Sequence, residues 1–122
     1  MNTRDIIRWL SACPALEGEA LTPDYLPAHR GWSLSADGQT VRTDILGRRS
    51  AVRKLKITRR ITVADSEARL AALEQLEDFA EWAAANPPPG GTVRLTGLPE
   101  YRSRASSGTE DLTVVILLES DL

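Results

Sequence analysis

The chain has 122 residues, of which 42% are hydrophobic and 26% are charged, and its formal net charge is -2 at pH 7. These values fit one globular domain, residues 1–122, with a single hydrophobic core. The only cysteine, Cys13, excludes an intrachain disulfide and a zinc site of several cysteines. No apolar run approaches the roughly 18 residues of a membrane span, and the first residues do not resemble a secretion signal, so we expect a soluble, unexported protein with no membrane partner.

A short helix is predicted at the N-terminus. Asn2 or Thr3 can cap it, and Asp5 lies near its positive end, where a carboxylate is favourable. Apolar residues recur on one side of this segment, and the helix should run to about Cys13, because Pro14 cannot continue it.

The stretch from Pro14 to Pro27 combines prolines with small residues and acids. This composition is typical of an extended connection, and it does not indicate a linker between domains. Tyr25 and Leu26 are expected to hold the connection against the core.

The next part of the chain has the alternation of β-strands. Trp32 and Leu34 alternate with polar residues, residues 36–39 have the chemistry of a hairpin turn, and a second strand is expected at 40–46. Residues 47–50 should form a second turn.

The strand after this turn has the clearest alternation in the chain. One face carries Leu55, Ile57, Ile61 and Val63, and the other carries Lys54, Lys56, Thr58, Arg60 and Thr62. The pattern predicts a half-solvated antiparallel ribbon with a cationic outer face.

One long helix is predicted from about Glu67 to Asn86, with Asp65 or Ser66 at its start. Its apolar stripe consists of Leu70, Leu73, Leu76, Phe79, Ala80 and Ala83, and Glu67, Glu74, Asp78 and Glu81 lie opposite. The prolines after Asn86 end the helix, and its stripe should pack across one face of the sheet.

The C-terminal third completes the sheet. Residues 92–98 are predicted to form a strand, residues 99–111 to be exposed and mobile, and the continuous apolar run 112–118 to form a central strand. The long helix covers one face of this strand, so the other face needs the N-terminal helix or a neighbouring subunit, which indicates oligomerisation. The prediction is an α+β fold with a mostly antiparallel β-sheet, one long helix packed on one face and a short N-terminal helix.

The sequence offers little to catalysis. His29 is the single histidine and stands in no recognisable motif, and Cys13 lies at the predicted negative end of a helix, where a thiolate is disfavoured. No cluster has the spacing of metal ligands or of a phosphate-binding loop. We therefore expect a protein that is not an enzyme, with no catalytic residue, no cofactor and no metal.

Basic residues gather in residues 42–60 against a single acid, Asp44, whereas the long helix is rich in acids. The candidate assembly surface consists of Arg42, Arg48, Arg49, Arg53, Lys54, Lys56, Arg59 and Arg60, together with Trp82 of the helix. The basic strand can be a solvated face, a protein–protein surface, or a surface that binds nucleic acid through its phosphates, because this segment has no aromatic residue to stack on bases. Trp82, like Trp32, is either a core anchor or an interface anchor.

Several motifs follow one another in a recognisable order after the N-terminal helix. They are Leu21-Thr22-Pro23-Asp24-Tyr25-Leu26-Pro27, Trp32-Ser33-Leu34-Ser35, Asp44-Ile45-Leu46-Gly47-Arg48-Arg49, Leu55-Lys56-Ile57-Thr58-Arg59-Arg60 and Leu76-Glu77-Asp78-Phe79-Ala80-Glu81-Trp82, before a loop with prolines and a closing apolar strand. In this order they resemble the minor capsid or tail-terminator proteins of long-tailed bacteriophages, over most of the chain.

The resemblance implies a structural virion protein of the head–tail junction, assembled in the bacterial host cytoplasm. Such proteins form a hexameric ring at the head-proximal end of the tail tube, stop its polymerisation and join the tail to the head connector. The implied partners are further copies of the chain, the tail tube protein, the head–tail connector protein and, non-specifically, DNA in the lumen.

Two alternatives to the tail terminator remain open. A head-completion or neck protein is the nearest variant, and a nucleic-acid-binding module that contacts the phosphate backbone is the other. In a ring, the cationic ribbon of one subunit would lie against the acidic helix face of the next.

Overall fold

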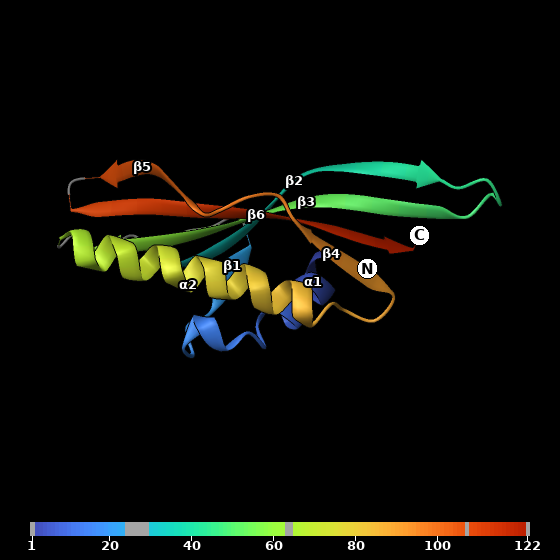
Figure 1. The fold of residues 1–122 in the computed structure, drawn as a ribbon. Coiled ribbons are helices and arrows are strands. Elements are labelled where there is room, and N and C mark those ends of the chain that lie inside the picture. Colours follow the sequence, from blue (N-terminus) through green and yellow to red (C-terminus); the bar gives the residue numbers. More distant parts are fainter. Residues whose placement is uncertain (1, 24–29, 63–64, 107, 122) are drawn as a thin grey trace.

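The computed structural model describes residues 2–23, 30–62, 65–106 and 108–121, and at 37 and 101–106 it describes the backbone alone. This part of the chain forms a six-stranded sheet with two α-helices and one short 3-10 helix (Figure 1). The elements in chain order are α1 (Thr3–Leu10), the 3-10 helix η1 (Pro14–Leu16), β1 (Leu21–Pro23), β2 (Gly31–Thr43), β3 (Arg49–Thr62), α2 (Ser66–Ala85), β4 (Gly91–Leu95), β5 (Glu100–Ser106) and β6 (Thr109–Asp121). The predicted α+β class is confirmed, with a mostly antiparallel sheet, one long helix and one short N-terminal helix. The expectations for Tyr25, Leu26, His29 and Val63 lie outside the described residues.

The strands lie in the order β1-β2-β3-β6, and β4 and β5 both pair with the other edge of β6. β1 is parallel to β2, and the remaining pairings of the described sheet are antiparallel. β4 pairs with residues 116–120 and β5 with residues 109–113. The apolar run 112–118 therefore lies inside the sheet, as its composition predicts.

The N-terminal helix α1 begins with a capping box. The Asp5 amide donates to Asn2 Oδ1 at 2.8 Å, and the Asn2 amide donates to Asp5 Oδ2 at 3.1 Å. The helix ends at Leu10, before the predicted end at Cys13, because a turn leads directly into η1 at Pro14.

The long helix α2 closely matches its predicted bounds. The Asp65 side chain accepts a hydrogen bond from the Ala68 amide at 2.9 Å and so caps the first turn. At the other end Asn86 is the C-cap, and the prolines that follow it lead into β4.

The β2–β3 hairpin differs from the prediction. Residues 36–39 are a β-bulge inside one long strand, because Ala36 pairs with Leu55 and Gln39 with Arg53, and Gly38 accommodates the extra residue at φ +108°. The strand predicted to reach residue 46 ends at Thr43, and the predicted second turn at 47–50 falls too late.

The turn itself is organised by Asp44. Its Oδ1 accepts hydrogen bonds from the amides of Leu46 and Arg48, both at 2.9 Å, and Gly47 adopts φ +81°. We call residues 44–48 the tip of the hairpin.

The prediction that residues 99–111 are exposed is wrong at the end of this segment. Its described part contains β5 and the start of β6, and Thr109, Glu110 and Asp111 are buried, whereas Glu100 and Gly108 are exposed. The carboxylates of Glu110 and Asp111 each have an arginine partner, Arg69 and Arg60 respectively, and the pairing makes their burial acceptable.

All helices of the described chain cover the same face of the sheet (Figure 1). One core combines Ile6 and Leu10 of α1, Leu16 of η1, Leu76, Phe79 and Ala83 of α2, Leu55 and Ile57 of β3, and Leu112, Val114, Ile116 and Leu118 of β6. The alternative in which the N-terminal helix covers the second face is therefore wrong. We call that second face the open face; by strand alternation it carries Lys54, Lys56, Arg94, Val115 and Leu117.

Candidate assembly surface

Arg59 does not belong to the surface predicted for it. It is 2% exposed, because its odd position in β3 places it on the same side as Leu55 and Ile57. Its guanidinium lies 4.8 Å from the ring centroid of Trp32, and its Nη1 lies 3.0 Å from Glu19 Oε2. Arg59 is therefore a core residue, and the alternation of its neighbours is the signal that could have placed it there.

Glu19 is held beside two arginines. Burial raises the pKa of Glu19, but hydrogen bonds from Arg59 and Arg30 outweigh burial and bring this pKa below its ordinary value. The same carboxylate accepts from the Trp32 indole at 3.4 Å. The cluster ties the segment before β1 to the sheet and stabilises the fold.

Arg60 lies on the open face but forms an ion pair with Asp111. Its Nε and Nη2 donate to the two carboxylate oxygens at 2.8 and 3.0 Å. The hydrogen bond to Asp111 raises the pKa of Arg60, and the side chain is only 17% exposed. The pair joins β3 to β6 and leaves little of Arg60 exposed for contact with another molecule.

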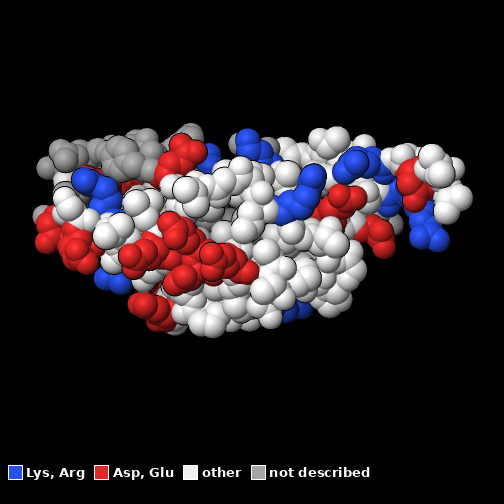
Figure 2. All heavy atoms as spheres, viewed as in Figure 1, with Lys and Arg blue, Asp and Glu red and all other residues white. Residues whose placement is uncertain are grey.

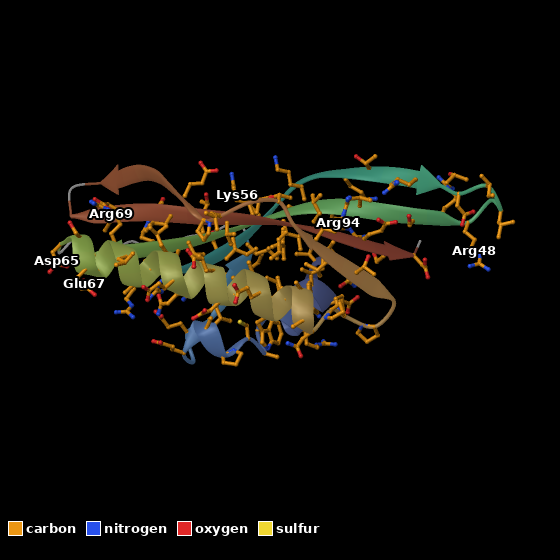
Figure 3. The ribbon with its side chains drawn as sticks, in the orientation of Figure 1. Arg48, Lys56, Asp65, Glu67, Arg69 and Arg94 are labelled. Atoms are coloured by element: carbon orange, nitrogen blue, oxygen red, sulfur yellow. The ribbon has the colours of Figure 1, made fainter. Side chains whose placement is uncertain are left out.

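Arg53 and its neighbours fall on opposite sides of β3. Arg53 faces the helix side, where its Nε donates to Gln39 Oε1 at 3.2 Å beneath the bulge. Lys54 and Lys56 lie on the open face, and Lys56 points away from the helix layer (Figure 3). Arg94 of β4 shares a row with Lys54 across β6. The basic residues of the predicted ribbon are thus divided between the two faces of the sheet, and only those on the open face, such as Lys54 and Lys56, share one surface.

The remaining predicted arginines surround the hairpin tip. Arg48 and Arg49 are exposed, and Arg42 lies 3.5 Å from Glu119 of β6. In the hairpin tip itself, Ile45 is fully exposed and Leu46 is 75% exposed. The sequence interpretation missed these two apolar residues because it counted them as part of a strand.

A groove lies between α1 and the end of α2. It has a volume of about 650 Å³, and its apolar walls include Trp9, Ala12, Trp82 and Pro88, with Asp5 and Arg8 at the rim. The Trp9 indole donates to the Asn86 carbonyl at 2.7 Å and fixes the two helices. Trp82 is half-buried and packs against the core, so it both anchors the core and presents a surface.

Acidic side chains cover the outer side of α2. They are Glu67, Glu74, Glu77, Asp78 and Glu81, all exposed, and they form the acidic band in Figure 2. Asp78 and Glu17 line a second hollow that also includes Trp82, so acids flank this tryptophan. At the right of Figure 2, around the hairpin tip, basic and acidic side chains lie together. The hollow there is lined by Arg42, Arg48 and Arg49 and by Asp44, Glu119 and Asp121. The predicted contrast of charge is therefore present only in part, because α2 is acidic on its outer side and the hairpin end is mixed.

Reactive groups are few in the described part of the chain. Burial raises the pKa of the Cys13 thiol, which disfavours the thiolate. Among the described residues no group of three or more His, Cys, Asp or Glu side chains is placed to hold a metal ion, and no described helix is long and apolar enough to cross a membrane.

No protein-family model matches the chain, and no curated protein matches it significantly.

Proposed function

We propose that the protein is a tail terminator of a long-tailed bacteriophage, a structural virion protein that closes into a ring at the head-proximal end of the tail tube. The ordered motifs and the α+β fold support this proposal. The ring stops polymerisation of the tube and joins the tail to the head connector.

The observation that carries the proposal is the exposed apolar pair at the hairpin tip. The turn between β2 and β3 lies beyond the helix layer (Figure 1), and its Ile45 and Leu46 are fully and largely exposed, respectively. The turn that holds them is ordered by Asp44, and pairing of β3 with β6 continues to Ser50. Apolar side chains on a well-supported projection are typical of a contact with another molecule.

The action of such a protein is steric. A ring of identical subunits, six in the family, covers the growing end of the tube and offers its opposite surface to the connector. DNA passes through the lumen of the ring. Lys54, Lys56 and Arg94 would supply non-specific phosphate contacts wherever the open face borders that lumen.

The test is electron microscopy of lysates from a producing phage in which the gene is disabled. We expect headless tails of uncontrolled length beside filled heads, and normal virions when the gene is supplied in trans. Tails of normal length that fail to join heads would indicate the neck or head-completion role. Normal particles without the gene would contradict the proposal.

A further inference from the structure

The hairpin tip and the tryptophan groove are two different surfaces of one chain. The tip offers Ile45 and Leu46, and the groove offers the indoles of Trp9 and Trp82. The tip is largely exposed and the tryptophans of the groove are half-buried, so covering both would remove apolar surface from water.

The tip is not placed to fill the groove of its own chain. β3 pairs with β6 up to Ser50, and the tip therefore lies at the far end of the sheet from the helices (Figure 1). Folding the tip back would break this pairing. A hairpin tip can therefore reach this groove only if it belongs to a second copy of the chain.

The charges around the two surfaces are complementary. Arg48 and Arg49 follow the apolar pair after one residue, Gly47, and are exposed. Asp78 lines the neighbouring hollow that shares Trp82 with the groove, and Glu81 precedes Trp82 on α2; both are exposed acids. The charged side chains that line the groove itself are Asp5 and Arg8. Unlike charges at the rim of an apolar contact favour the correct partner and the correct orientation.

We infer that the hairpin tip of one chain docks into the Trp9–Trp82 groove of a second copy of the same chain. Ile45 and Leu46 enter the groove, and the neighbouring arginines face the acids of α2. The contact joins two unlike patches, so it is heterologous and passes from one chain to the next, as ring closure requires. The inference rests on the proposed ring and names the interface that builds it.

Paramagnetic relaxation enhancement between full-length chains tests this contact. A ¹⁵N-labelled Cys13→Ala chain is mixed with an unlabelled Cys13→Ala/Thr43→Cys chain that carries a nitroxide beside the tip. We expect the indole N–H signals of Trp9 and Trp82 to lose intensity before other signals. The method detects short-lived encounters, so it does not require a stable ring in solution.

Two matched controls accompany the experiment. Adding Ile45→Ser and Leu46→Ser to the nitroxide chain should abolish the intensity loss, while adding Leu98→Ser, another exposed apolar residue, should leave it unchanged. Because Ile45, Leu46 and Leu98 are all largely exposed, these substitutions should leave the fold intact.

Unaffected Trp9 and Trp82 signals would overturn the inference, as would an equal effect from the Ile45→Ser/Leu46→Ser chain. The phage experiment separates this failure from failure of the proposed function. If loss of the gene gives overlong tails but the Ile45→Ser/Leu46→Ser gene restores normal tails, the terminator stands and the interface is wrong. If the encounter is observed but particles without the gene are normal, the interface stands and the terminator role is wrong.

Discussion

Arg59 shows how a charged side chain can belong to a core. Its stem and guanidinium lie against the Trp32 ring, and Trp32 in turn stacks on Phe79 with ring centroids 5.8 Å apart. A cation over an aromatic face is favourable, but a buried charge also needs an opposite charge nearby. Glu19 supplies it, so the stability of this region depends on one carboxylate near the protein surface.

Replacing Glu19 with Gln should destabilise the fold by about 1–3 kcal/mol, because Arg59 would keep its burial and lose its charged partner. The folded-state pKa of Glu19 is lowered from 4.5, so its carboxylate stabilises the fold above that pH. This contribution disappears as the pH falls through the lower folded-state pKa. Urea titrations between neutral pH and pH 3 should therefore show less acid destabilisation in Glu19→Gln than in the wild type.

Glu17→Gln is the matched control, since Glu17 is an exposed acid two residues away. It should alter neither the free energy of unfolding nor its pH dependence by a comparable amount. Equal effects of the two substitutions would show that the Glu19–Arg59 pair has no special role.

At the scale of elements, α2 is attached to β6 by an ion pair near its start. Arg69 Nη2 lies 2.6 Å from Glu110 Oε1, and Arg69 Nε donates to Glu110 Oε2 at 2.8 Å. Glu110 is 1% exposed. Arg69→Met should cost about 3 kcal/mol, because it removes the arginine from a buried carboxylate.

The double variant Arg69→Met/Glu110→Leu should recover much of this loss, because it leaves no buried charge without its partner. Thermal or urea unfolding of the two variants measures the difference. Arg94→Met, at an exposed arginine of β4, should have little effect. A double variant as unstable as the sum of its single variants would mean that the two side chains do not interact.

The Asp44 side chain supports the hairpin tip in addition to two backbone hydrogen bonds, from the Asp44 amide to the Arg48 carbonyl and from the Gly47 amide to the Asp44 carbonyl. Asp44→Ala removes the acceptor for the amides of Leu46 and Arg48 and should cost about 1 kcal/mol. Amide hydrogen exchange at these two residues should become faster, with little change in β6. Asp44→Asn retains Oδ1 and should keep the protection, and equally fast exchange in Asp44→Asn would contradict this role of the side chain.

Local patterns predicted the elements well where one signal dominated. Asp65 and the prolines after Asn86 fixed both ends of α2, and the apolar run 112–118 identified the central strand. Patterns failed where pairing with a distant strand decided the outcome. Gly38 looks like a turn residue, yet β3 continues past it and makes the site a bulge. Glu110 and Asp111 looked exposed because they find their arginine partners only in the folded chain.

The candidate site was predictable only in part. The concentration of positive charge in residues 42–60 was visible, but its division between core, ion pair and surface depends on the side of the sheet that each residue faces. Strand alternation could have excluded Arg59 from the surface, whereas no local sequence pattern indicates that Arg60 pairs with Asp111. The groove unites Trp9 with Trp82, and no sequence pattern relates two tryptophans so far apart in the chain.

At the scale of the whole molecule, the outer side of α2 presents acids, and the hairpin end presents arginines together with a few acids (Figure 2). A contact between unlike ends orients every subunit in the same direction, as a ring demands. The attraction between exposed charges is screened by salt, so the encounter of tip and groove should weaken as ionic strength rises.

Reversing the charges on the tip and on α2 tests the electrostatic contribution to the encounter of tip and groove. Arg48→Glu/Arg49→Glu on the nitroxide-bearing chain should greatly reduce the intensity loss at the Trp9 and Trp82 signals of the labelled chain, because glutamates would face the acids of α2. Pairing that chain with Asp78→Lys/Glu81→Lys on the labelled chain should restore the loss, since attraction returns with reversed signs. Lys54→Glu/Lys56→Glu on the open face is the matched control and should change the signals little. If this control reduced the intensity loss equally, the cationic side of the contact would lie on the open face instead of at the tip. That result would agree with the basic ribbon expected from the sequence.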